Sequence, residues 1–258
     1  MIKNTIKNLK KKIKIYQFNK HSSIKKFKKL IVNYGLYKAE KKFMFRANQV
    51  FGEIDLRNKS LLEIGCGDGV YSIWAKLSGA KHVIGLEPEL DGNISGSSMI
   101  FKRLINELDL DDIECIPQTI EEFNHNGMKF DIVLSNMSIN HLDEDACMRL
   151  DTDLDAQEKY LAIFNKIKSI MNHNGKLIIL DNSDKNFFKL FNRSSPFCRG
   201  VDWRKHQSPK VWVKLLKQAD FSDPKISWPS RYFYLKNLYC PKLISFFLDS
   251  FFRIEMES

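Results

Sequence analysis

The stretch Leu61–Ser72, LLEIGCGDGVYS, places three glycines within five residues, between an apolar run and a segment with helical periodicity. A buried strand that feeds a tight glycine turn and then a helix is typical of a site for a nucleotide-like ligand. Glycine lets the backbone approach such a ligand without an intervening Cβ. The dinucleotide pattern G-x-G-x-x-G does not fit, because Val70 occupies its third glycine position. The acids Glu63 and Asp68 would repel a pyrophosphate and suit a cationic ligand instead.

From residue 59 onward, short apolar runs alternate with segments of helical periodicity. Continuous apolar strands that alternate with helices indicate a parallel sheet covered on both faces. The sequence therefore predicts an α/β fold with a doubly wound, mostly parallel sheet of seven strands, expected within 60–65, 82–88, 113–118, 130–138, 176–182, 225–230 and 251–257. Helices are expected within 69–79, 94–110, 158–175 and 208–221, the last with Ser208 as its N-cap and Pro209 at its first position.

The basic residues are concentrated at the N-terminal end of the chain. Residues 1–60 hold 17 Lys and Arg against 3 Asp and Glu, whereas the remainder holds 24 against 28. Apolar residues at helical spacing indicate a helix near residues 2–13 and a second helical region near 24–51, which Gly35 can interrupt. We expect residues 1–58 to form a basic helical leader or cap and residues 59–258 to form the ligand-binding domain, with an irregular insertion at 183–207.

Beyond the glycine turn, LLEIGCGDG resembles motif I of the class I S-adenosylmethionine-dependent methyltransferases, a Rossmann-like family. The resemblance continues at Glu87 in VIGLEPE, in PQTIEEF and in FDIVLSNMSINHLDE, and it covers roughly residues 59–182. It implies that S-adenosylmethionine is the cofactor and S-adenosylhomocysteine the product. It also implies that the cofactor is held by residues of the four loops that follow the first four strands, namely Glu63, Gly65, Cys66, Gly67, Asp68, Gly69, Glu87, Pro88, Thr119, Ile120, Ser135 and Asn136.

Several branches of that family are disfavoured by the residues that follow the fourth strand. The Asn/Asp-Pro-Pro-aromatic motif of nucleic-acid amino-methylating members is absent, and so is the paired-glutamate loop of arginine methyltransferases. Asp181 and Asn182 match half of the metal site of catechol-type members, but Ser135 and Asn136 leave the other half unfilled, so we expect no metal. The chain is also similar in layout to bacterial methyltransferases from surface-polysaccharide and capsule gene clusters.

The expected reaction is transfer of the sulfonium methyl group to an oxygen, or less favourably a nitrogen, of a small anionic, phosphorylated or nucleotide- or sugar-linked acceptor. A hydroxyl acceptor needs a base, and histidine suits that role near neutral pH. His141 follows the fourth strand and His206 follows the insertion, so both are candidate catalytic residues. An acceptor oxygen that is already ionised would need neither. Within the insertion, Arg199, Trp203 and Arg204 are candidate substrate contacts, since guanidinium groups suit phosphate and aromatic faces suit a base or a sugar.

Two other functions stay open from the sequence: an RNA methyltransferase that holds phosphates with its basic leader, and a non-catalytic protein of the same fold. We do not favour nucleic acid as a partner, and the leader could equally touch a membrane surface. No segment reads as a membrane span, and five scattered cysteines without a C-x-x-C pair indicate reduced thiols and a cytoplasmic location. The sequence leaves the oligomeric state open.

Overall fold

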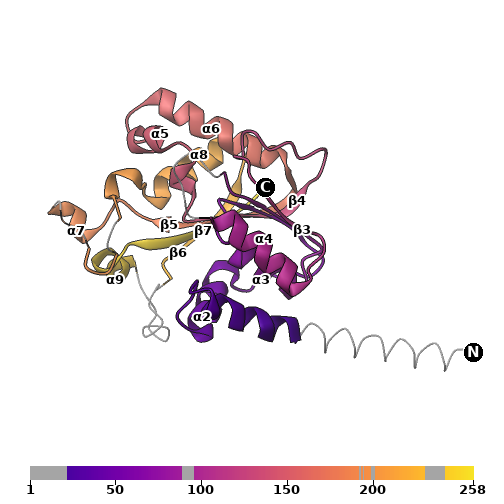
Figure 1. Ribbon diagram of the computed structural model, residues 1–258. Helices are drawn as coiled ribbons and strands as arrows, with labels where there is room; N and C mark the ends of the chain where they lie inside the picture. The colour runs from indigo at the N-terminus through magenta and orange to yellow at the C-terminus, as the bar shows by residue number, and fades with distance from the viewer. Residues whose placement is uncertain (1–21, 89–95, 192, 194, 199–200, 230–241) are drawn as a thin grey trace, which may run out of the picture.

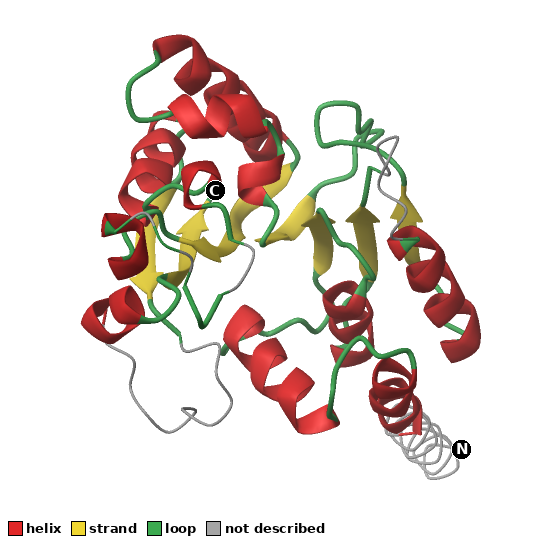
Figure 2. Ribbon diagram, turned by 60° about the vertical axis from the view of Figure 1, so that its left-hand side comes forward, coloured by secondary structure: helices red, strands yellow, loops and turns green. Residues whose placement is uncertain are grey.

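The computed structural model describes residues 22–88, 96–191, 193, 195–198, 201–229 and 242–258, so the helix expected near residues 2–13 lies outside the described residues. One sheet runs through the centre of the molecule, and helices cover both of its faces (Figure 1). The turned view of Figure 2 shows the strands side by side, with loops at both ends of the strands.

The sheet has seven strands in the order β3-β2-β1-β4-β5-β7-β6. Their bounds are Ser60–Ile64 (β1), His82–Leu86 (β2), Ile113–Ile116 (β3), Phe130–Asn136 (β4), Met171–Asn182 (β5), Ser222–Ser227 (β6) and Phe251–Glu257 (β7). β1 to β5 are parallel, while β7 runs antiparallel to both β5 and β6. The chain leaves β1 toward β2 and β3 and then crosses to β4, so the order reverses between β1 and β4. Ligands of doubly wound folds bind at the carboxyl ends of the strands at such a reversal.

Two clusters of buried apolar residues hold the helices against the sheet, one on each face. On one face, α6 (Leu154–Ser169) and α8 (Pro209–Gln218) contribute Tyr160 and Trp212, whose ring centroids lie 5.1 Å apart. On the other face lie α3 (Val70–Ser78), α4 (Ser97–Leu108) and α2 (Glu40–Phe51). Burial on both faces explains why β1 and β4 read as continuous apolar runs in the sequence.

The described part of the N-terminal segment packs directly on the sheet domain. Residues 22–33 form a helix that ends before Gly35, which has a φ of 73°, and α2 follows. Phe43 of α2 contacts the rings of Tyr71 and Trp74 in α3, and the Tyr37 hydroxyl is 2.7 Å from that of Tyr71. These helices therefore share an apolar core with the strands on one face of the sheet.

The structure confirms most of the expected elements and shifts several of their boundaries, among them the starts of α6, β5 and β6. α8 begins at Pro209 after Ser208, and α3 is followed by Gly79, as the sequence predicts. The helix expected to end at Gly175 ends at Ser169, because residues 171–175 already belong to β5. Met171 pairs with Phe130, and the N–H of Ser258 donates to the carbonyl of Gly175, so sheet pairing prevails over the helical periodicity.

The described residues of the region 183–207 include two short helical turns, α7 (Phe187–Leu190) and η2 (Trp203–Lys205). Three further short elements lie outside it: η1 (Ile139–His141), α5 (Glu144–Arg149) and α9 (Lys242–Phe247). Among the described residues, no helix combines the length and the apolar character that a bilayer crossing requires.

Candidate active site

A pocket of about 500 Å³ opens at the carboxyl ends of β1, β2 and β4, where the strand order reverses. It is lined by residues of the four loops that follow the first four strands and by the short helices after β4, namely Ile64, Gly65, Gly67, Leu86, Glu87, Pro88, Gln118, Thr119, Ile120, Glu121, Met137, Ser138, His141, Leu142 and Glu144. Of the residues predicted to hold the cofactor, the pocket brings together Gly65, Gly67, Glu87, Pro88, Thr119 and Ile120, with the predicted base His141 on its wall.

The three glycines of the first loop have different structural roles. A Cβ at Gly65 would lie 2.5 Å from the Cβ of Ser138, and a Cβ at Gly69 would lie 2.2 Å from the ring of Phe101. Those two positions therefore lack a side chain because the protein itself fills the space. Gly67 has a φ of 51°, lines the pocket and has no atom within 4 Å of where its Cβ would stand. A ligand can reach the main chain there, which is what a cofactor cradle needs.

Two acids flank this loop in different environments. Glu87 follows β2, and its carboxylate accepts a hydrogen bond of 2.7 Å from the N–H of Gly67. Glu63 lies within β1, is fully buried, and accepts a hydrogen bond of 2.6 Å from the hydroxyl of Ser72. Burial raises the pKa of Glu63 to about 8, assisted by the charge of Glu87 and opposed by the Ser72 hydrogen bond. Glu87 thus faces the pocket, while Glu63 sits behind the loop and supports it.

The loop after β4 is fixed to the first strand by a serine pair. The Ser138 hydroxyl donates to the carbonyl of Ile64 at 2.5 Å and lies 2.8 Å from the hydroxyl of the buried Ser135. Met137 has a φ of 60°, which is uncommon for a residue with a side chain, and its N–H donates to the carbonyl of Leu180 at 2.7 Å. Such locally strained backbone is often found at functional sites. These bonds hold the wall that carries His141.

His141 stands at the end of η1 with one ring nitrogen fixed by a carboxylate. Its Nδ1 lies 2.6 Å from Oε1 of Glu144, and the other oxygen of Glu144 accepts a hydrogen bond of 2.5 Å from Nζ of Lys205. The ammonium of Lys205, followed by the hydrogen bond with His141, lowers the pKa of Glu144. The three side chains form a row from the pocket wall to η2, so the insertion is tied to the candidate base.

His206, the other predicted base, is buried and contacts a carboxylate at the end of β5. Its Nδ1 lies 3.1 Å from Oδ1 of Asp181, and the neighbouring Gln207 donates to the carbonyl of Cys147 at 2.6 Å. His206 does not line the pocket with His141. In this arrangement it anchors the end of the insertion to the sheet.

Several other predicted site residues lie outside the pocket lining. Cys66 points into the core beside Phe101 and Gly85, and Asp68 is half-buried with a hydrogen bond to Ser97. Gly69 and Ser135 support the loops from behind, and Asn136 ends β4 outside the lining.

The remaining predicted contacts belong to the insertion: Trp203 is 7% exposed, Arg204 is exposed and paired with Asp202, and Arg199 lies outside the described residues.

The charge of the pocket suits the cofactor that the sequence implies. Its described lining carries the carboxylates of Glu87, Glu121 and Glu144 and holds no lysine or arginine. S-adenosylmethionine carries a positive sulfonium and an ammonium group, which acidic surroundings favour. A carboxylate at Glu87 can accept two hydrogen bonds from a ribose diol, and the open space beside Gly67 leaves room for the ligand to approach the main chain. The residues present therefore fit this cofactor.

A larger hollow of about 790 Å³ lies at the opposite edge of the sheet, near the starts of β4 and β5. Several of its charged groups form ion pairs: Lys176 pairs with Glu255 and with Glu257 beside it, and Arg253 pairs with Glu255. The smaller pocket at the carboxyl ends of the strands is therefore the candidate active site. In the described part of the chain, no group of three or more histidine, cysteine, aspartate and glutamate side chains is placed to hold a metal ion.

Glu144, Ser138 and Met137 are pocket residues that sequence reasoning did not single out. A signal for Glu144 exists in the sequence, because it lies three residues after His141 and therefore on the same side of a helical turn. Thr119 was predicted, but its role in the structure is also local. Its hydroxyl accepts from the N–H of Glu122, whose carboxylate accepts from the N–H of Thr119, and this reciprocal pair shapes the turn that carries Ile120.

Comparison with known proteins places the chain among methyltransferases. A family model described as "Methyltransferase domain" matches residues 37–226, well over half of the chain. One curated relative is protein arginine N-methyltransferase 1 of Schizosaccharomyces pombe, which is 34% identical over 110 residues. That match covers 41% of this chain and only 29% of the yeast protein.

Solved structures of low sequence identity share the fold. An S-adenosylmethionine-dependent methyltransferase from Mesorhizobium loti has a TM-score of 0.56 and 12% identity, with 83% of this chain and 96% of that chain covered. Geranyl diphosphate C-methyltransferase from Streptomyces coelicolor A3(2) has a TM-score of 0.55 and 11% identity, with 83% and 79% covered. The latter was crystallised with Mg²⁺, geranyl diphosphate and S-adenosyl-L-homocysteine.

Proposed function

The chain belongs to the methyltransferase-domain family, whose members use S-adenosylmethionine, and from this premise we propose that it methylates a hydroxyl oxygen of a small acceptor with His141 as the general base. One observation carries the proposal. His141 lines the same pocket as Gly67 and Glu87, and the carboxylate of Glu144 holds its Nδ1 at 2.6 Å. A base oriented by a third group, beside the cofactor cradle, is the arrangement that acceptor activation requires.

The residues that would hold the cofactor are those the pocket shares with motif I and the following loops. Gly65 and Gly67 offer main chain without side chains, and Glu87 offers a carboxylate for the ribose diol. The turn that carries the buried Ile120 lines the pocket where the adenine would lie. When bound, S-adenosylmethionine supplies an activated methyl group. What the protein adds is alignment of the acceptor and exclusion of water from the pocket.

The carboxylate of Glu144 determines which nitrogen of His141 acts. Its hydrogen bond places the imidazole proton on Nδ1. Nε2, which lies 3.4 Å from Nδ2 of Asn140, is then the nitrogen that accepts the proton of the acceptor hydroxyl. The ammonium of Lys205 keeps Glu144 ionised, since it holds the pKa of that carboxyl below its usual range. After the transfer, the imidazolium is stabilised by the same carboxylate until it releases the proton to water.

The charge of the pocket narrows the acceptor class that we expected from the sequence. The lining carries three carboxylates and, among its described residues, no cation to pair with a phosphate. Two cations of the insertion are also paired with carboxylates, Arg204 with Asp202 and Lys205 with Glu144. An uncharged hydroxyl, such as that of a sugar, therefore suits the site better than a phosphorylated group. A role in surface-polysaccharide or capsule biosynthesis is compatible with this chemistry.

The proposal is tested by methyl transfer from labelled S-adenosylmethionine to sugars, nucleotide-linked sugars and amines, with the product identified by mass spectrometry. His141→Ala should lower kcat toward a hydroxyl acceptor by about 10²–10⁴-fold, with the affinity for S-adenosylhomocysteine nearly unchanged. His125→Ala is a matched control, because His125 bonds the carbonyl of Met128 away from the pocket. An unchanged rate in His141→Ala would remove the base from the mechanism.

Nitrogen methylation is the second candidate, and one observation favours it. The local similarity to protein arginine N-methyltransferase 1 spans 110 residues, and acidic pocket walls also suit a cationic amine or guanidine. The same panel separates the two, since an amine that reacts well in wild type and equally well in His141→Ala would assign the acceptor as nitrogen.

A further inference from the structure

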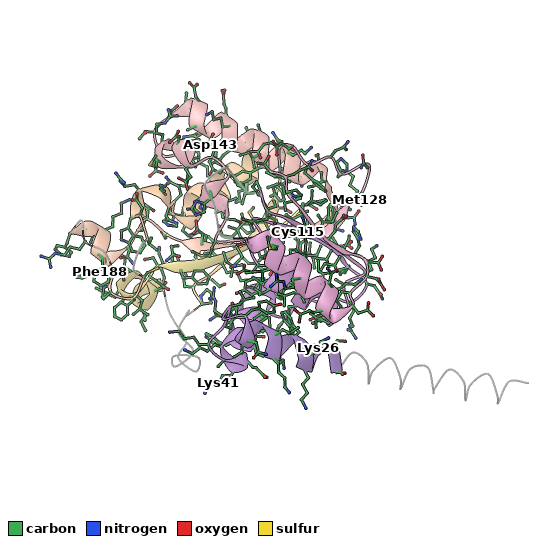
Figure 3. All side chains as sticks on the ribbon, in the orientation of Figure 1. Lys26, Lys41, Cys115, Met128, Asp143 and Phe188 are labelled. Carbon is green, nitrogen blue, oxygen red and sulfur yellow. The ribbon has the colours of Figure 1, made fainter. Side chains whose placement is uncertain are left out.

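A group of exposed apolar side chains lies outside the pocket lining, on α7, on α9 and in the segment that follows α7. The group consists of Leu190, Phe191, Phe197, Leu243 and Phe247, which are between 46% and 72% exposed. We call it the apolar lobe. Figure 3 labels Phe188 of α7 at the side of the molecule, where this part of the chain projects beyond the sheet that carries Cys115. Exposed apolar clusters of this kind mark interaction surfaces more often than isolated apolar residues do.

The aromatic rings of the lobe form one connected group across two segments distant in sequence. The ring of Phe187 lies 5.1 Å from that of Phe247 and 5.2 Å from that of Phe191, and the ring of Phe188 lies 6.3 Å from that of Phe197. The inner rings thus support the outer ones, and the exposed side chains share a single surface.

Buried polar side chains hold this surface in place from beneath. Nδ2 of Asn186, which is 1% exposed, donates to the carbonyl of Phe246 at 3.3 Å and to the hydroxyl of Ser250 at 3.0 Å. The hydroxyl of the buried Ser195 donates to the carbonyl of Leu248 at 2.9 Å. Hydrogen bonds from buried groups fix α7, the following turn and the end of α9 to one another, so the apolar side chains are displayed on a fixed frame.

The charges around the lobe are mostly positive. Lys185, Lys189, Arg193 and Lys242 lie in the segments that form it, and the acids there, Asp184 and Asp249, are both buried. Lys185 and Lys189 share the single carboxylate of Asp184 at 2.8 and 3.1 Å, so one of these two charges is left over. Apolar side chains beside surplus cations are the combination by which a protein binds an anionic lipid surface.

We propose that the apolar lobe is a membrane-docking surface that inserts Leu190, Phe191 and Phe247 among the acyl chains of an anionic bilayer, with the surrounding cations at the level of the headgroups. The lobe sits at the carboxyl edge of β5, since α7 follows the end of that strand and α9 precedes Phe251, which pairs with Asn182. Docking through it brings that edge of the sheet, where the pocket opens, toward the membrane. A second copy of the chain is a poorer occupant, because face-to-face pairing would bring the surplus cations of both copies together.

The test is co-sedimentation of the full-length protein with vesicles of phosphatidylcholine alone or mixed with phosphatidylglycerol. The double variant Leu190→Ser/Phe191→Ser should lower partitioning onto the anionic vesicles by about 10- to 100-fold. The matched control is Met99→Ser/Leu154→Ser, because Met99 on α4 and Leu154 on α6 are 63% and 73% exposed and lie outside the lobe. The control should bind as wild type does, and all three proteins should unfold at the same temperature.

A second measurement reports on the lobe itself, because the basic N-terminal segment could also attract vesicles. Phe191→Trp should gain fluorescence that is quenched by brominated acyl chains, over the background of the native tryptophans. Wild-type partitioning in the Leu190→Ser/Phe191→Ser variant would overturn the proposal, and so would an unquenched signal from the introduced tryptophan in vesicle-bound protein. Vesicle-free dimerisation that the double variant abolishes would overturn it in favour of a second copy.

Discussion

At the scale of single residues, two glycines of the first loop have different roles: Gly69 is required by the packing of the fold, and Gly67 leaves space for a ligand. Gly69 and Gly67 both have positive φ values, yet only Gly69 faces an occupied space, the ring of Phe101. Gly69→Ala should therefore lower the free energy of unfolding by about 2–4 kcal/mol, through overpacking and the left-handed conformation together. Urea unfolding measures this loss.

Gly67→Ala provides the contrast within the same loop. It meets no protein atom, so it should cost only about 1–2 kcal/mol of stability, from its backbone conformation. Its methyl group would instead occupy space in the pocket and weaken the binding of S-adenosylhomocysteine in calorimetric titration. Equal losses of stability in the two variants would show that the open space at Gly67 is not what distinguishes them.

Glu63 gives a pH dependence whose sign follows from its burial. Its folded pKa of about 8 lies above the unfolded value near 4.5, so between these pH values the folded state holds a proton that the unfolded state has lost. Stability should therefore fall as pH rises through this window, by up to about 1.4 kcal/mol per pH unit, and level off above it.

Glu63→Gln tests that account, because a neutral amide can still accept the hydrogen bond from Ser72. The variant should lose this part of the slope when urea unfolding is repeated across the window, and it should be more stable than wild type at the upper end. A slope identical to that of wild type would mean that another group carries the pH dependence.

At the scale of elements, the ion pair between α5 and η2 connects the insertion to the chemistry. Lys205→Ala removes the largest influence that lowers the pKa of Glu144, so this carboxylate should take up its proton at a higher pH. With a positive charge removed beside them, His141 and Glu144 should as a pair take up a proton more readily as pH falls, so the acid limb of kcat/KM should move to higher pH. Lys205→Arg keeps the charge and should restore the wild-type profile. If Lys205→Ala leaves the pH dependence of kcat/KM unchanged, the ion pair between Lys205 and Glu144 contributes only to packing.

The elements also show which features the sequence could predict. The order of strands and helices, the start of α8 at Pro209 and the end of α3 at Gly79 follow from local periodicity and capping. The boundary between α6 and β5 does not, because the pairing of Met171 with Phe130 joins residues distant in sequence. The orientation of the site residues could not be predicted either. They lie in loops, where no apolar periodicity shows which side chains face inward. Motif matching could not tell that Gly67 faces the pocket while Cys66 turns into the core.

At the scale of the whole molecule, the pocket joins the two halves of the core. Ile64, Leu86 and Ile120 of its lining belong to the apolar cluster on one face of the sheet, while Met137 packs against the cluster on the other. A ligand held between loops that extend from both clusters binds the folded chain and finds no site in the unfolded one. Binding should therefore stabilise the entire domain rather than a single loop.

S-adenosylhomocysteine at about one hundred times its dissociation constant should accordingly raise the free energy of unfolding by about 2.7 kcal/mol, measured as a shift in thermal denaturation. Glu87→Ala removes the carboxylate at the centre of the pocket and should weaken binding roughly hundred-fold, so the same concentration should leave the melting temperature almost unchanged. His141→Ala should keep the full shift, because the base acts on the acceptor. If wild type and Glu87→Ala shift equally, the cofactor is held elsewhere, and the placement of the reaction at this edge of the sheet would have to be abandoned.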